Sequence, residues 1–253
     1  MKKIFVSLLL ITVLMVPTAA LAQDMEMNGD QPADSALSQN TQANQVVATV
    51  NGEEITSQQL AQQANVNQIL QQVSQVDQQL AQLLASSEAG NTVLEELQKA
   101  KLDNLIDNVL LRQAAEESDI TLSQAEKDEI YQQQKQSILQ QNQMNEEQFQ
   151  SILEQQGYEN EAAYKEEFSN NPQIKINKLI EEEVVANIEI SEEELQQAYD
   201  ENEEAFAQSG QEDTSFESLK PQLEQMLRQQ KQNQAIQEYL EQLREDAEIE
   251  KNI

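Results

Sequence analysis

The chain lacks cysteine and histidine, and these two absences exclude much of the chemistry that side chains perform in enzymes. Ser-His and Cys-His nucleophilic sites and His-based zinc sites cannot be built from this sequence. Disulfide bonds are excluded as well, so the fold depends on packing alone. Tryptophan is absent, and aromatic residues make up 4% of the 253 residues.

Glycine and proline are scarce, with 5 and 4 residues. No glycine-rich phosphate loop is present, so nothing in the sequence nominates a nucleotide site. The residues that replace these helix breakers are mainly Gln, Glu, Leu and Ala, which form helices readily. The composition therefore predicts a mainly α-helical protein.

Positive charge is also scarce, with 15 basic against 46 acidic residues and a formal net charge of −31. Such a surface repels nucleic acid, so we expect no nucleic-acid partner. Two interpretations of the acidity stay open: a surface adapted to solubility or a saline medium, and a surface complementary to basic polypeptides. Carboxylate pairs such as those at 181–183 and 192–194 are expected by chance at this acidity. We predict no catalytic residue, no cofactor and no metal site, and hence no enzyme.

The N-terminus has the features of a secretory signal peptide. Lys2 and Lys3 precede an apolar run at 4–16, and Ala20-Leu21-Ala22 follows, so residues 1–22 are predicted to be removed after Ala22. The run is short for a membrane span, and no span is predicted elsewhere. No cysteine follows it for lipid attachment. Residues 23–45 are polar and acidic without apolar periodicity, which predicts a disordered linker and an exported, periplasmic or extracellular protein.

Both ends of the remaining chain have strand-like patterns. The segment VVATVNGEEI at 46–55 is β-branched and contains Asn51-Gly52, which predicts either a hairpin or a single strand ending in a turn. The C-terminal AEIEKNI alternates apolar and polar residues like an edge strand, and the 46–50 segment is its expected partner. A third short strand is predicted at 187–190.

Helices are predicted between these ends. The clearest lies within 92–117, where one apolar stripe has helical spacing. Its residues are Leu102, Leu105, Ile106, Val109, Leu110 and Ala114. Thr56 is predicted to cap a long helix through Ser86. Its heptad-like seam consists of Val66, Ile69, Val73, Val76, Leu80 and Leu83. This seam serves either an intramolecular helical hairpin or assembly with another chain.

Capping patterns place the later helices. Helices are expected to begin at Ser123, Asn145, Asn160 and Ser191. Gly157 is expected after the second, and the third is expected to run through Ile180 with a kink or a break at Pro172. A polar loop at 208–215 precedes a last long helix. Most aromatic side chains of the central region are expected to be core, and a minority could line an apolar groove. The candidate peptide-binding residues are Phe149, Ile152, Tyr158, Tyr164 and Phe168.

The order of these segments resembles the N-terminal chaperone domain of the SurA-type periplasmic folding factors, which are related in layout to the PrsA foldases. The matching pieces are VVATVNGEEIT, KLDNLIDNVLLRQAAEESDITLSQAE, MNEEQFQSILEQQGYENEAAYKEEF, NIEISEEELQQAYDENEEAF and the closing segment at 215–250. The family has a parvulin isomerase domain where this chain has only the loop at 208–215, and the parvulin site relies on histidines. The resemblance implies a chaperone module without the isomerase.

These observations predict a mainly α domain at 46–253 with a small sheet that pairs its two ends, completed by a helix and strand at 215–253. The predicted function is an exported, ATP-independent chaperone that binds unfolded or newly translocated polypeptides. The alternative is a secreted helical scaffold or adaptor that assembles through the seam between Val66 and Leu83.

Overall fold

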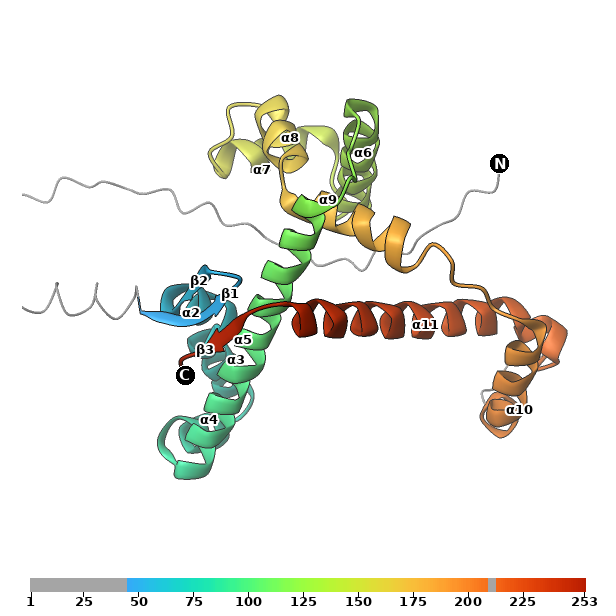
Figure 1. Ribbon diagram of the computed structural model, residues 1–253, viewed down its shortest axis with the longest axis horizontal. Helices are drawn as coiled ribbons and strands as arrows, with labels where there is room; N and C mark the ends of the chain where they lie inside the picture. Colours follow the sequence, from blue (N-terminus) through green and yellow to red (C-terminus); the bar gives the residue numbers. More distant parts are fainter. Residues whose placement is uncertain (1–44, 209–212) are drawn as a thin grey trace, which may run out of the picture. The chain divides into compact units, whose positions relative to one another are not determined.

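The computed structural model describes residues 45–208 and 213–253, which are mainly helical with one small antiparallel sheet (Figure 1). The described chain forms two compact units: residues 123–171 make up the first, and the segments before and after them make up the second. The predicted signal peptide and nearly all of the predicted linker lie outside the described residues. Within the described ranges, no helix is both long and apolar enough to cross a membrane.

The sheet joins the two ends of the second unit, as predicted. Strands β1 (Val46–Val50) and β2 (Glu53–Thr56) form a hairpin, which settles the alternative left open by the sequence. Asn51 and Gly52 both have positive φ, 52° and 83°, as a tight hairpin turn requires. Strand β3 (Ile249–Lys251) pairs antiparallel with β1, so the strand order is β2-β1-β3.

Helix α5 (Glu88–Glu117) is the central helix of this unit and confirms the predicted stripe. Leu102, Ile106 and Leu110 are at most 3% exposed and pack with the hairpin in one apolar cluster. The helix begins four residues earlier than predicted, because the Ser87 side chain accepts a hydrogen bond from the Gly90 amide at 3.0 Å and caps it. Gly90 therefore lies inside the helix rather than at its start.

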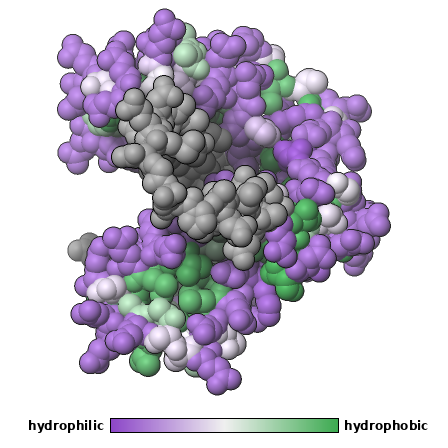
Figure 2. All heavy atoms as spheres, turned by 90° about the vertical axis from the view of Figure 1, so that its left-hand side faces the viewer, coloured by the Kyte–Doolittle hydropathy of each residue, from purple (hydrophilic) through white to green (hydrophobic). Residues whose placement is uncertain are grey.

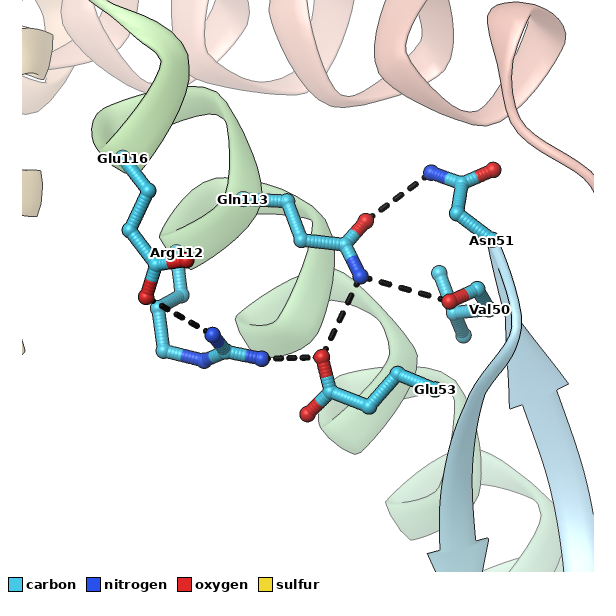
Figure 3. A network of polar contacts seen from close by, with 6 residues as sticks. All are labelled: Val50, Asn51, Glu53, Arg112, Gln113 and Glu116. Carbon is cyan, nitrogen blue, oxygen red and sulfur yellow. Dashed lines mark hydrogen bonds and ion pairs between the residues drawn. The ribbon is translucent and has the colours of Figure 1, made fainter.

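Polar contacts fix the hairpin turn against α5 (Figure 3). The Gln113 side chain accepts a hydrogen bond from Asn51 Nδ2 at 2.8 Å and donates to the Val50 carbonyl at 3.2 Å. Arg112 pairs with Glu53 and, at 2.8 Å, with Glu116. These side chains on the polar side of α5 hold the turn in place, so this network is structural.

The C-terminal strand is tied to the same helix. Arg244 Nε donates to Asp107 Oδ1 at 2.6 Å, and Lys251 Nζ lies 2.5 Å from Asp103 Oδ1. Arg244 belongs to helix α11 (Phe216–Asp246), the long helix that leads into β3. The last helix and strand therefore complete the sheet and cover α5.

The prediction of one helix from Thr56 to Ser86 is wrong. The segment forms three helices: α2 (Ser57–Ala64), α3 (Val66–Val76) and α4 (Gln78–Ser86). Asn65 adopts the left-handed conformation (φ 48°) that ends α2, and Asp77 is extended and accepts hydrogen bonds from the first amides of α4. The heptad-like seam is therefore divided between α3 and α4. It offers no continuous coiled-coil face, although Val76, Leu80 and Leu83 of the seam remain exposed.

The strand predicted at 187–190 is also absent: these residues form a turn and an extended segment. Around it, Pro172 begins helix α9 (Pro172–Leu179), which continues into the π-helix η1 (Ile180–Val184). Helix α10 (Glu192–Gln208) begins at the predicted Ser191–Glu194 capping box. The predicted loop at 208–215 contains four residues, 209–212, that lie outside the described chain.

Two further apolar clusters stabilise the second unit. In one, Ala115 of α5 and Ile120, which follows this helix, pack with Ile176 and Leu179 of α9. In the other, α10 packs on the first turns of α11, and its buried residues are Leu195, Ala198, Leu219 and Leu223. Phe206, one of the central aromatic residues, is half-buried and packs against this second cluster.

Candidate polypeptide-binding site

Three helices form the unit at 123–171, and each begins with a capping residue that the sequence predicted. Helices α6 (Gln124–Gln141) and α7 (Glu146–Gln155) start with capping boxes at Ser123 and Asn145, and Asn160 caps α8 (Glu161–Ser169). Gly157 (φ 93°) follows α7 in the left-handed conformation, so α7 ends and the chain turns toward α8. These local signals place the aromatic residues of the three helices in one small unit.

Four aromatic rings gather around Tyr164 in this unit and form a cluster of five with it. The Tyr164 ring centroid lies 6.1 Å from both Tyr131 and Phe149, 5.1 Å from Tyr158 and 6.4 Å from Phe168. Most of these contacts are edge-to-face, which is the favourable arrangement for aromatic quadrupoles. The cluster joins α6, α7 and α8 and the turn between α7 and α8.

A lysine is buried beside the rings. Lys135 is 8% exposed; its Nζ lies 2.8 Å from Glu161 Oε1 and 2.5 Å from Glu146 Oε2. It also lies 5.5 Å from the centroid of the Phe149 ring, within the range of a cation–π interaction. The Tyr131 hydroxyl donates to the same Glu161 oxygen at 3.0 Å. The charge is thus paired on both sides, as a buried cation requires.

The protonation states follow from these contacts. The hydrogen bond from Lys135 holds the pKa of Glu161 below its usual value of 4.5. Burial lowers the pKa of Lys135, but its hydrogen bonds to Glu146 and Glu161 outweigh burial, and the net pKa is raised. Burial raises the pKa values of Tyr131, Tyr158 and Tyr164, so these hydroxyls stay protonated at neutral pH.

The structure brings four of the five candidate residues together. Phe149 is 3% exposed and forms the floor of the cluster, while Tyr158, Tyr164 and Phe168 are half-buried and remain in part accessible. Ile152 is half-buried on α7, one turn from Phe149, and is not among the ring contacts. The accessible part of the candidate site therefore consists of the exposed portions of three rings beside the buried Phe149.

Two central residues were not nominated from the sequence, namely Tyr131 and Lys135. Both lie on α6, before the short-helix pair on which the nominations rested. The sequence contains a signal for this pair. Lys135 follows Tyr131 by four positions and precedes Ile138 by three, so the helical spacing places a cation on the apolar face of this helix.

The acidic side chains of the described chain do not gather into a metal site. No group of three or more acidic residues in residues 45–208 and 213–253 is arranged to hold a metal ion. The acidic runs have structural uses: Glu192 pairs with Lys220 at 2.6 Å, and Glu194 caps α10 and pairs with Lys231 at 2.5 Å. Partly accessible rings can bind apolar side chains.

These features define a class of protein: a helical module closed by a small sheet between its two ends, with accessible apolar surface. A family model described as the SurA-like N-terminal domain matches residues 1–180. The chain therefore belongs to the family of SurA-like N-terminal domains. None of the curated proteins matches it. The family match includes β1, β2, α5 and the unit at 123–171, whereas α10, α11 and β3 lie beyond it.

Proposed function

We propose that the protein is an exported, ATP-independent chaperone that binds unfolded or newly translocated polypeptides. Membership of the family of SurA-like N-terminal domains supports a chaperone-like role. The observation that carries the proposal is the cluster of half-buried rings, Tyr158, Tyr164 and Phe168, on the rigid floor of Phe149. Export is supported by the sequence of residues 1–22 alone.

Partly exposed aromatic rings suit a chaperone because they bind apolar side chains without requiring a particular client sequence. Apolar contact gives roughly 25 cal/mol for each Å² removed from water, whichever apolar side chain the client offers. Glutamine and tyrosine polar groups around the rings can hydrogen-bond a client backbone. Contact with only a few rings gives weak binding, so clients are released without nucleotide.

Prolyl isomerisation is not part of the proposed function. The matching family model describes the N-terminal domain, and the chain contains no histidine for a parvulin-type site. A protease-coupled peptide assay with the full chain should show no acceleration above the uncatalysed rate. Acceleration would overturn this part of the proposal.

Light scattering from an aggregating client tests the chaperone proposal. The full chain at several-fold molar excess should suppress aggregation without ATP. Tyr158→Ser and Phe168→Ser should weaken suppression because they remove accessible rings, whereas the matched variants Tyr158→Phe and Phe168→Tyr, which keep a ring, should retain it. An inactive wild-type chain would contradict the proposed function, and equal activity of the Ser variants would exclude the rings as the binding site.

A further inference from the structure

A second apolar surface lies on three consecutive helices of the other unit. The exposed side chains there are Val76 of α3, Leu80 and Leu83 of α4, and Val93 of α5, with exposed fractions of 91%, 47%, 59% and 56%. We call these four residues the apolar tip. They account for most of the large apolar side chains that the described chain leaves exposed; the others are Met226 and Ile253. Figure 2 shows apolar surface gathered in its lower part, at the level of α3 and α4 in Figure 1.

The helices of the tip do not bury their apolar faces. Helix α3 is amphipathic, yet none of its residues is buried, and Val66, Ile69, Leu70 and Val73 are all half-buried. In α4, only Ala81 is buried. A helix with a clear apolar stripe and no buried residue has surface left for a partner.

The tip cannot remove this surface from water by closing further on α5. At Gly90, an added Cβ atom would lie 2.4 Å from the carbonyl oxygens of Leu83 and Leu84, so the backbones of α4 and α5 are already in contact. The apolar side chains thus stay at the surface, because α4 and α5 cannot move closer together at Gly90.

The charge around the tip indicates what it binds. Between Ser57 and Ser87 the only charged residue is Asp77, in a chain with a net charge of −31. The next charged residues, Glu88, Glu95 and Glu96, are acidic, and no basic residue occurs until Lys99. The apolar tip therefore belongs to an amide-rich part of the chain whose nearest charged residues in sequence are acidic, and of these Glu96 is paired with Lys99 at 2.8 Å.

Acidic residues next to an apolar segment favour a ligand with an apolar centre and positive ends. A second copy of this chain would bring a further charge of −31 toward the same surface, which opposes self-association. We propose that the apolar tip is a docking site for apolar segments of unfolded polypeptides flanked by lysine or arginine. This inference rests on the proposed chaperone function and adds a second binding surface with a defined client chemistry.

Fluorescence anisotropy with the full chain tests this. The probe is a short labelled peptide with a centre of leucine and valine and lysines at both ends, and the matched peptide has glutamates at both ends. The lysine peptide should bind more tightly, and added salt should weaken its binding. Leu80→Ser combined with Leu83→Ser should weaken it by about tenfold, since about 1.4 kcal/mol of apolar contact is lost.

Met226→Ser is the control variant, because Met226 is an apolar residue of similar exposure (44%) on α11. It should leave binding unchanged. Equal affinity for the two peptides would overturn the inference, as would a double Ser variant that binds like wild type. Absence of binding by the wild-type chain would also overturn it.

The outcomes separate this inference from the proposed function. A chain that binds the lysine peptide through the tip but does not suppress aggregation supports the docking site and contradicts the chaperone function. The Leu80→Ser and Leu83→Ser substitutions could instead leave both aggregation suppression and peptide binding unchanged. This result would support the chaperone function and contradict the docking site at the tip. Sedimentation showing a dimer that these substitutions abolish would identify the tip as a self-contact and overturn the inference.

Discussion

At the scale of single residues, Gly90 determines how closely α4 and α5 approach each other. It is in the first turn of α5, two residues before the predicted start of this helix. Its actual role is close approach: no atom larger than hydrogen fits between it and the backbone of Leu83 and Leu84. Such approach, and not a positive φ, explains the glycine.

Gly90→Ala should therefore destabilise the protein by about 1–3 kcal/mol, because the new methyl group must push α4 away from α5. Urea denaturation followed by circular dichroism measures this. Asn91→Ala, at the exposed neighbouring position, is the control and should have little effect. An unchanged Gly90→Ala midpoint would mean that the junction is looser than the structure shows.

A second residue-scale prediction concerns Glu161. Its pKa is lowered by Lys135, so its stabilising contribution is complete above its ordinary value of 4.5 and is lost as the pH falls through the lower folded value. The raised pKa of Lys135 has the opposite sign: its contribution is complete below 10.5 and is lost only as the pH rises further. Acid should therefore weaken the unit at 123–171, and neutral pH should not.

Glu161→Gln should remove this acid dependence and, at neutral pH, destabilise the unit by about 1–3 kcal/mol, since Lys135 then keeps only Glu146 as an anionic partner. Near-ultraviolet circular dichroism of the tyrosines, recorded during urea denaturation at several pH values, reports on this. Glu159→Gln changes an exposed carboxylate two residues away and should behave as wild type. A Glu161→Gln chain as stable as wild type would show that the pair is not stabilising.

At the scale of elements, α5 is the helix on which the second unit depends. Ile106 is fully buried between the hairpin and α11 residues. Ile106→Ala should cost about 2–5 kcal/mol through the cavity it leaves, and Ile106→Asp should prevent folding because it buries an unpaired charge. Circular dichroism and thermal melting measure both. Asn104→Asp is the control, because it adds the same charge at an exposed position of this helix. A folded Ile106→Asp chain would contradict the central position of α5.

The sequence predicts those elements whose signals are local. Thr56, Ser123, Asn145 and Ser191 begin helices as expected, since a capping side chain bonds to amides two or three residues away. The Asn51-Gly52 hairpin is predictable for the same reason. The pairing of the two ends was also predicted, because the 46–50 segment was the β-rich candidate far in sequence from the C-terminal strand.

The errors occur where alternatives of similar energy compete. Asn65 and Asp77 sit inside a seam that is periodic enough for one helix, but their side chains and backbones favour a turn and a cap. At Ile188 and Ile190, the local pattern is that of a strand, yet no strand lies beside it in the described chain, and a strand requires a partner. Local periodicity does not contain this information.

The candidate site was predictable in part for the same reason. Phe149, Tyr158, Tyr164 and Phe168 could be nominated because they lie in the predicted pair of short helices. The contacts of Tyr164 and Phe168 with Tyr131, more than thirty residues before Tyr164, depend on how α6 packs on α8. The apolar tip could not be predicted for a different reason. The sequence identifies the seam residues, but their exposure follows from the helix breaks at Asn65 and Asp77.

At the scale of the whole molecule, the dominant quantity is the net charge of −31. Nearly every basic residue discussed above already has an acidic partner, such as Arg244 with Asp107 and Lys135 with Glu161. The unpaired excess is negative and spread over the surface. Folding concentrates these charges, so their mutual repulsion lowers the free energy of unfolding.

Salt should therefore stabilise this protein. Raising NaCl from about 0.01 M to about 1 M shortens the Debye length from roughly 30 Å to 3 Å and screens long-range repulsion. Salt also weakens the surface ion pairs, but each of those contributes only about 0–1 kcal/mol. The thermal midpoint should rise by several degrees, measured by circular dichroism with KCl as a second salt and sucrose as an uncharged control. A thermal midpoint that falls with salt would mean that the ion pairs stabilise the protein more than the repulsion destabilises it. A saline medium would then not relieve a destabilising effect of the acidic surface.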